Sequence, residues 1–334
     1  MNKNKISTLT TIAFAASLSL AACGGGGGGG GSTAASGSNT STSGSGNTGT
    51  TSATTGNVTT PQYANNSAQQ ALFNTINAQR TQCGFPALTE NTLLDKSSQA
   101  HADYMGQNGG TITDTEVSGN PGFTGVDYAA RATAVGYPAS TVFMVGESGG
   151  YYTNATLTEA AYGAGIANSL AGSVYHVDLF ILPVTQIGIG WNETTFDNYP
   201  EAHAAITAAN LQPMTGSLPL MFPCDGATGV RYKVTGETPT PPNTNGTYGP
   251  AISVAANSSD VVVLTSGTLT DTSGNVIVLQ LLNSTNDPNN LTEKYEARAY
   301  SATPLTANTK YSVSLAGTID GTPFSRTGSF TTGS

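Results

Sequence analysis

The stretch SVYHVDLFILPVTQIGIGW, residues 173–191, sets the expectation for the fold of this 334-residue chain. It places His176, one of only three histidines, directly before a turn and a strand. Gly188 and Gly190 alternate with apolar residues, so a neighbouring backbone can approach one face of the strand closely. The apolar positions are Val184, Ile187, Ile189 and Trp191. The pattern predicts a central strand over residues 186–192.

A second segment upstream carries a carboxylate. The apolar run 142–145 reads as a strand that ends in Gly146-Glu147. Glu147 and His176 then come from separate segments, and a carboxylate and an imidazole brought together in this way can form a polar site. The alternative interpretation is a solvated glutamate and a packed histidine.

Several short motifs follow one another along the chain. They are Asn77-x-x-Arg80, Gly84-Phe85-Pro86-Ala87-Leu88, Ala100-His101-Ala102-x-Tyr104-Met105, residues 131–137 (RATAVGY), Gly146-Glu147, Tyr175-His176 and Gly188-Ile189-Gly190. In this order they resemble the CAP superfamily of cysteine-rich secretory, antigen 5 and pathogenesis-related proteins, also called SCP domains. The resemblance covers roughly residues 67–232. It implies an α-β-α sandwich with a cleft lined by two histidines and two acidic residues. In some members the histidines hold a divalent metal.

The chain departs from that family pattern at two places. A His-x-Glu arrangement after the second helix is replaced by Asp114-Thr115-Glu116, and the arginine that often follows the cleft histidine is replaced by Val177. The constellation that the resemblance implies is therefore Asp114, Glu116, Glu147 and His176, with Tyr175 as a further ligand-binding candidate. Imidazole suits zinc, whereas carboxylates favour harder ions, so a tight zinc site is not expected. A divalent metal on His176 and Asp114 stays open, and no cofactor is assigned.

The N-terminus has the features of a bacterial lipoprotein signal. Lys3 and Lys5 precede an apolar run that is too short for a finished transmembrane helix. The run ends in Leu20-Ala21-Ala22-Cys23, which resembles a lipobox, so residues 1–22 would be removed and Cys23 lipidated. Gly24 in place of an aspartate favours the outer membrane of the cell envelope. The alternative is an ordinary cleavable signal with an incidental cysteine.

Residues 23–66 are rich in Gly, Ser, Thr and Asn and contain almost nothing that could form a core. We expect a flexible tether there, with a glycosylated stalk as the alternative. The whole chain has a formal net charge of −9 and only 9% charged residues. A sparse acidic surface argues against nucleic acid as a partner and against binding to anionic lipid head groups.

With Cys23 lipidated, Cys83 and Cys224 remain. In an oxidising compartment an even pair indicates a disulfide, here one that would join the loop after the first helix to the end of the same domain. The alternative is two buried thiols.

Residues 67–236 should form the first folded domain. Helices are expected over residues 68–80, with Ser67 as N-cap, and over 91–107, 128–135 and 158–170. His101 should face the apolar interior of its helix as a structural residue. Residues 201–210, with His203, are expected to be a helical insertion on the surface, and residues 218–222 a closing strand.

Residues 237–247 are rich in Pro and Asn and are expected to be an extended linker. Short β-branched or aromatic runs follow, separated by turn signals such as Asp320-Gly321, and predict a β-sandwich over residues 248–334. The segment 305–311 and the terminal run 329–332 resemble the end of bacterial Ig-like domains. The expected fold class is α+β, an α-β-α sandwich followed by an all-β Ig-like sandwich.

Three functions are compatible with these features. The favoured one is a non-enzymatic surface lipoprotein that binds a lipid, glycan or protein in the Glu147–His176 cleft. The second is a hydrolase in which Glu147 or Asp114 acts as general base and His176 orients water or a metal. The third is a structural or adhesive module with a vestigial cleft.

Overall fold

The strand predicted around residues 186–192 lies inside a four-stranded sheet. This computed structural model describes residues 55–139 and 144–334; the signal segment, Cys23 and most of the predicted tether lie outside these ranges. The sheet has the order β1-β3-β4-β2, in which β3 and β4 form a long antiparallel hairpin. Its strands are β1 (Thr89–Glu90), β2 (Met144–Tyr152), β3 (Val184–Phe196) and β4 (Tyr199–Leu211).

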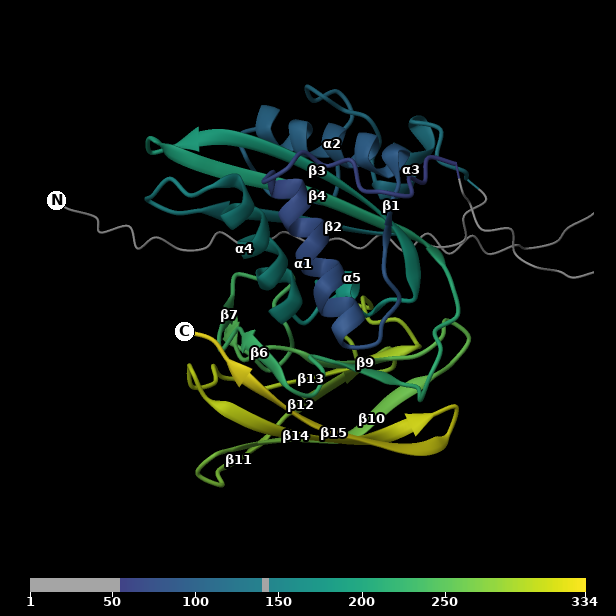
Figure 1. The fold of residues 1–334 in the computed structure, drawn as a ribbon, viewed down its shortest axis with the longest axis vertical. Coiled ribbons are helices and arrows are strands. Elements are labelled where there is room, and N and C mark those ends of the chain that lie inside the picture. The colour runs from purple at the N-terminus through teal and green to yellow at the C-terminus, as the bar shows by residue number, and fades with distance from the viewer. Residues whose placement is uncertain (1–54, 140–143) are drawn as a thin grey trace, which may run out of the picture.

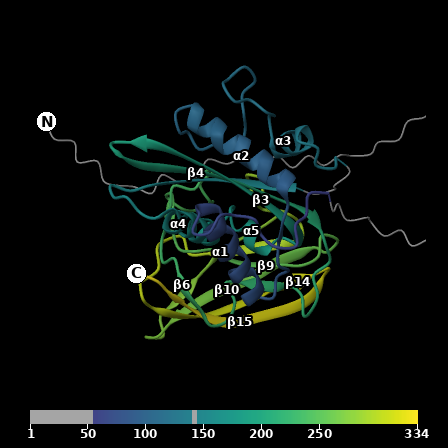
Figure 2. The same cartoon turned by 45° about the horizontal axis from the view of Figure 1, so that its top comes forward.

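Helices cover both faces of this sheet. Figures 1 and 2 show α2 (Thr92–Gln107) and α3 (Tyr128–Ala134) on one face and α1 (Ala68–Gln82) and α4 (Glu159–Gly172) on the other. The short helix α5 (Asp178–Ile181) follows α4. Ser67 caps α1 through a hydrogen bond from Gln70 N, as the sequence predicts. The three layers of an α-β-α sandwich are therefore present.

Two glycines allow α2 to lie directly on β3. A Cβ added at Gly188 would lie 2.1 Å from the carbonyl carbon of Leu94, and one at Gly190 would lie 2.1 Å from the carbonyl oxygen of Ser98. Any side chain at either position would push the helix away from the sheet. The close backbone approach expected from the sequence is confirmed.

The prediction of a surface helix over residues 201–210 is wrong, because these residues form β4. Successive residues of this strand point to opposite faces, and both faces are covered by helices, so the segment is buried on both sides. His203 is fully buried as a result. The alanine-rich composition favours a helix locally, but burial between two layers overrides that preference.

The C-terminal part of the chain is a sandwich of two sheets. The five-stranded sheet has the order β11-β10-β14-β15-β6 and the four-stranded sheet the order β12-β13-β9-β5. The strands are β5 (Leu220–Phe222), β6 (Ala227–Val230), β9 (Ile252–Ala255), β10 (Val262–Asp271), β11 (Val276–Val278), β12 (Gln280–Asn283), β13 (Glu296–Tyr300), β14 (Lys310–Ile319) and β15 (Thr322–Thr332). The expected α+β class is confirmed.

The boundary between the two units differs from the prediction. Strand β5, expected to close the first domain, pairs with β9 of the sandwich, and β6 pairs with β15. The segment expected to be an extended linker lies between β7 (Val234–Thr235) and β8 (Thr247–Tyr248), which pair with each other. It folds back against the first unit instead of separating the two, since Glu237 is buried.

The folded part also begins before Ser67, the predicted start of the first domain. Gln62 N donates to Glu90 (2.6 Å) and the Tyr63 hydroxyl donates to Asp95 (2.7 Å). Residues 57–66 therefore pack against the first unit.

Cys83 and Cys224 form the predicted disulfide. Cys224 follows β5, so the bond joins the end of α1 to the sandwich rather than closing the first domain on itself. The apolar core crosses the same boundary, because Phe222, Ala255 and Tyr295 pack with the core of the first unit. The described residues contain no helix that is long and apolar enough to span a membrane.

Candidate functional site

Glu147 and His176, the predicted cleft pair, are both inaccessible to solvent. Glu147 lies on β2, and His176 lies in the turn between α4 and α5. The exposed fraction of each side chain is 0%. In this conformation, neither side chain can reach a ligand in solvent.

A carboxylate from the C-terminal part covers His176. Glu237 Oε1 lies 2.9 Å from His176 Nδ1 and accepts a hydrogen bond from Tyr175 N at 2.6 Å. The other carboxylate oxygen accepts from Val174 N and from the hydroxyl of Tyr248. Burial lowers the pKa of His176, and the neighbouring Glu237 only partly offsets this effect. The segment after β7 thus binds to His176 of the predicted cleft pair.

Glu147 has no hydrogen-bond partner for either carboxylate oxygen within the described residues. Burial raises its pKa well above the ordinary value, and the nearby carboxylates of Asp178, Asp114 and Glu237 raise it further. The low dielectric of these surroundings favours the protonated form of the carboxyl group over the charged form. In that state it is not a general base.

Arg298 is the cation of the buried interface. Its guanidinium contacts Asp178 of α5, lies 2.9 Å from Glu296 Oε1, and donates to Thr292 Oγ1 at 2.8 Å. Burial raises the pKa of Asp178 to about 6 and that of Glu296 to about 8, although Arg298 opposes both shifts. One side chain from the sandwich therefore holds the first unit through an internal ion pair.

Tyr175 belongs to the same interface. Its hydroxyl donates to Asp287 Oδ1 (3.0 Å) and accepts from Asn289 Nδ2 (2.8 Å). Both partners lie in the C-terminal unit, so this candidate for ligand binding contacts the sandwich.

Asp114 and Glu116 form a second cluster with α2 and α3. His101 Nδ1 lies 3.0 Å from Glu116 Oε1, and Tyr128 donates its hydroxyl to Asp114 at 2.5 Å. Burial alone would raise the pKa of Glu116, but hydrogen bonds from His101 and from Thr124 N lower it overall. Burial also lowers the pKa of His101. His101 faces inward, as predicted, and acts as a structural partner of this loop.

The four predicted cleft residues are therefore divided between two clusters. The link between them is electrostatic, since Asp114 raises the pKa of Glu147. Within residues 55–139 and 144–334, no three His, Cys, Asp or Glu side chains are arranged to hold a metal ion. Asp114 and His176, the predicted metal ligands, have other partners, so these residues do not fit a metal centre.

Sequence reasoning missed Glu237 and Arg298. The sequence context of each residue weakly indicates a buried partner. Glu237 is the only charged residue between Lys233 and Asp260, in the segment that was predicted to be a linker. Arg298 alternates with alanines on a strand that is buried on both faces.

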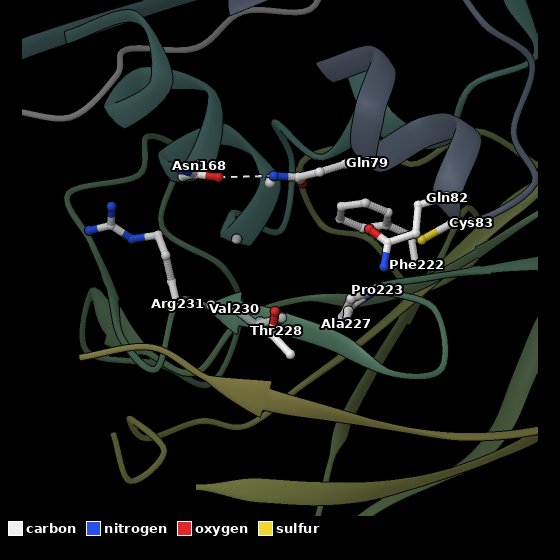
Figure 3. Close-up of a pocket in the computed structure, with 13 residues that line it drawn as sticks. Gln79, Gln82, Cys83, Asn168, Phe222, Pro223, Ala227, Thr228, Val230 and Arg231 are labelled. Carbon is white, nitrogen blue, oxygen red and sulfur yellow. Dashed lines mark hydrogen bonds between the residues drawn. The ribbon is translucent and has the colours of Figure 1, made fainter. Parts of the chain in front are cut away.

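A pocket lies elsewhere, at the junction of the two units (Figure 3). Gln79 and Gln82 of α1 and Asn168 of α4 form one side, and β6 forms the other. Gln79 donates to Asn168 at 2.9 Å on the helical side of the pocket. The pocket encloses about 80 Å³ and contains neither Glu147 nor His176. This pocket is thus separate from the predicted cleft pair.

Residues 73–207 match the model of the cysteine-rich secretory protein family, CAP. The match contains β2, β3 and most of β4, and it includes Asp114, Glu116, Glu147 and His176. This part of the N-terminal unit is therefore similar to the CAP family. A comparison with curated proteins found no match.

Proposed function

We propose that the protein is a surface-anchored binding or adhesion protein without enzymatic activity. In this proposal the residues of the CAP cleft hold the C-terminal sandwich in place instead of meeting a ligand from outside. The observation that carries it is the contact of buried His176 with Glu237 at 2.9 Å. The ion pair between Arg298 of the sandwich and Asp178 of the first unit also holds the two units together and supports the proposal.

The other two hypotheses require a different conformation. Ligand binding between Glu147 and His176 would need the segment around Glu237 to leave the histidine. General acid–base hydrolysis would further need a group within about 2.6–3.2 Å of the transferred proton, or one water away. Burial favours the protonated form of Glu147, and His176 is bonded to Glu237, so this arrangement does not supply such a base.

The anchoring part of the proposal rests on the sequence. Lipid on Cys23 would hold the protein on the outer membrane, and the tether would carry the folded part away from it. The partner would be a glycan, lipid or protein that binds to the exposed surface of the first unit and the sandwich.

Hydrolysis assays with ester and peptide substrates test the first part. Wild type, Glu147→Gln and His176→Ala should all show no turnover above buffer. Turnover in wild type that is lost in both variants would contradict the proposal. Fractionation tests the anchor: wild type should partition with membranes and Cys23→Ser should not. A wild-type protein that is already soluble would refute the anchor alone.

A further inference from the structure

The pocket at the junction of the two units has polar side chains on two opposing walls (Figure 3). The side-chain amides of Gln79, Gln82 and Asn168 come from α1 and α4, and the hydroxyl of Thr228 comes from β6. The Gln82 amide and the Thr228 hydroxyl point toward the space between the two walls. Both units therefore present hydrogen-bonding groups to one common space.

Much of this hydrogen-bonding capacity is available to a ligand. Among the residues drawn in Figure 3, the marked hydrogen bond is the one from Gln79 to Asn168 Oδ1, at 2.9 Å. A side-chain amide has two donors and an acceptor with two lone pairs, so Asn168 Nδ2 and the Gln82 amide can still bind another group. Asn168, Gln82 and Thr228 are exposed, so a ligand can reach them from solvent.

The lining of the pocket is almost free of charge. Among the residues that line it none has a carboxylate, and Arg231 is the only charged side chain. The guanidinium of Arg231 points away from Gln79 and Gln82 (Figure 3). A charged ligand would lose its hydration between these walls without gaining a counter-ion, which is costly. The lining therefore favours a neutral ligand.

Apolar groups and a disulfide complete the pocket. Phe222, Pro223 and Val230 line it together with the polar side chains. Cys83 also lines it and is bonded to Cys224, which lies between β5 and β6, so the disulfide joins the helical wall to the strand wall. Walls that are already fixed lose little conformational entropy when a ligand binds.

The volume of the pocket limits the ligand to a small group. One water needs a cavity of about 10–15 Å³. The pocket encloses about 80 Å³, which is room for several waters or for one small ring. A hydroxylated ring fits the lining, because each hydroxyl both donates and accepts, as the amides do, and its C–H groups can contact the apolar side chains.

We propose that this pocket binds one neutral sugar residue of a glycan. The inference rests on the proposed function as a binding protein, and it selects a neutral glycan from the three classes of partner named there. An extended peptide could also bond to the amides, but its chain would need a longer groove than a pocket of this volume.

A glycan microarray with neutral and acidic oligosaccharides tests the site. The probe is the full-length chain with Cys23→Ser, which removes the predicted lipidation site. Neutral glycans should bind, and calorimetric titration with the neutral oligosaccharide that binds best should show one site. Asn168→Ala and Gln82→Ala should each weaken its binding about two- to tenfold, as expected for the loss of one hydrogen bond. Asn74→Ala, an exposed amide of α1 outside the pocket, is the matched control and should leave the affinity unchanged.

Thr228→Trp should abolish binding, because the indole would fill the space between the walls. Thr228 is exposed on the edge strand β6, so this variant should fold like wild type. Equal affinity of Thr228→Trp and wild type would overturn the inference, and so would an array on which no neutral glycan binds. Binding of acidic glycans alone, or of peptides alone on a peptide array probed in parallel, would also contradict it. The proposed function fails by a different result, namely turnover in the hydrolysis assays.

Discussion

Replacement of Glu147 by methionine should stabilise the protein. The buried carboxyl group accepts no hydrogen bond in the described residues, and an unsatisfied buried polar group costs about 1–3 kcal/mol. Methionine is similar in length and flexible enough to fill the site without a polar atom. We therefore expect the free energy of unfolding to rise by about 1–3 kcal/mol near pH 5.

The gain should grow with pH. The pKa of Glu147 is raised in the folded state above its ordinary value of 4.5, so folded protein binds the proton more tightly than unfolded protein. The stability associated with this proton is lost as pH rises from the unfolded pKa through the folded pKa. A single group changes the free energy of unfolding by at most about 1.4 kcal/mol per pH unit. Glu147→Met has no carboxyl group at this position, so its stability should not show this pH dependence.

Urea unfolding at several pH values between about 5 and 8 measures both effects. Trp191, the only tryptophan, lies on β3 and reports on the first unit. Asp197→Asn, at the exposed tip of the β3–β4 hairpin, is the control and should leave the pH profile unchanged. A Glu147→Met variant that is less stable than wild type at every pH would refute the reasoning, because it would mean that the carboxylate has a favourable partner.

Three further predictions follow from the packing. Glu237→Ala removes the acceptor for several buried donors and should lower the free energy of unfolding by about 3–5 kcal/mol in urea titrations; a loss below 1 kcal/mol would show that the interface does not depend on it. Gly190→Ala should destabilise strongly in thermal melts, whereas the control Gly165→Ala, whose Cβ meets nothing closer than 3.6 Å, should be neutral or slightly stabilising. Cys83→Ser with Cys224→Ser opens a loop of 141 residues and should cost about 4–5 kcal/mol in the chain-entropy model. An unchanged melting temperature in this double variant would contradict that estimate.

Short-range signals in the sequence were enough for much of the first unit. The N-cap at Ser67, the helix around His101 and the glycines of β3 depend on residues within one or two turns or on one strand face. The same signals failed for β4, where an alanine-rich stretch with His203 is a strand. Local propensity cannot report burial between two layers, which comes from residues far away in the chain.

The sequence by itself predicted the order of elements in the first unit through its resemblance to the CAP superfamily. It predicted the C-terminal sandwich from the spacing of short apolar runs, and it favoured the disulfide because two cysteines remain after Cys23. Only the tertiary structure decided that β5 joins the second sheet and that Glu237 and Arg298 meet the first unit. The contacts of Glu237 with His176 and of Arg298 with Asp178 join residues more than 60 positions apart, and nothing local encodes which distant carboxylate will meet a buried imidazole. The physical reason is that the partner of a buried charge is chosen by how two separately folded surfaces pack, and packing depends on the whole chain.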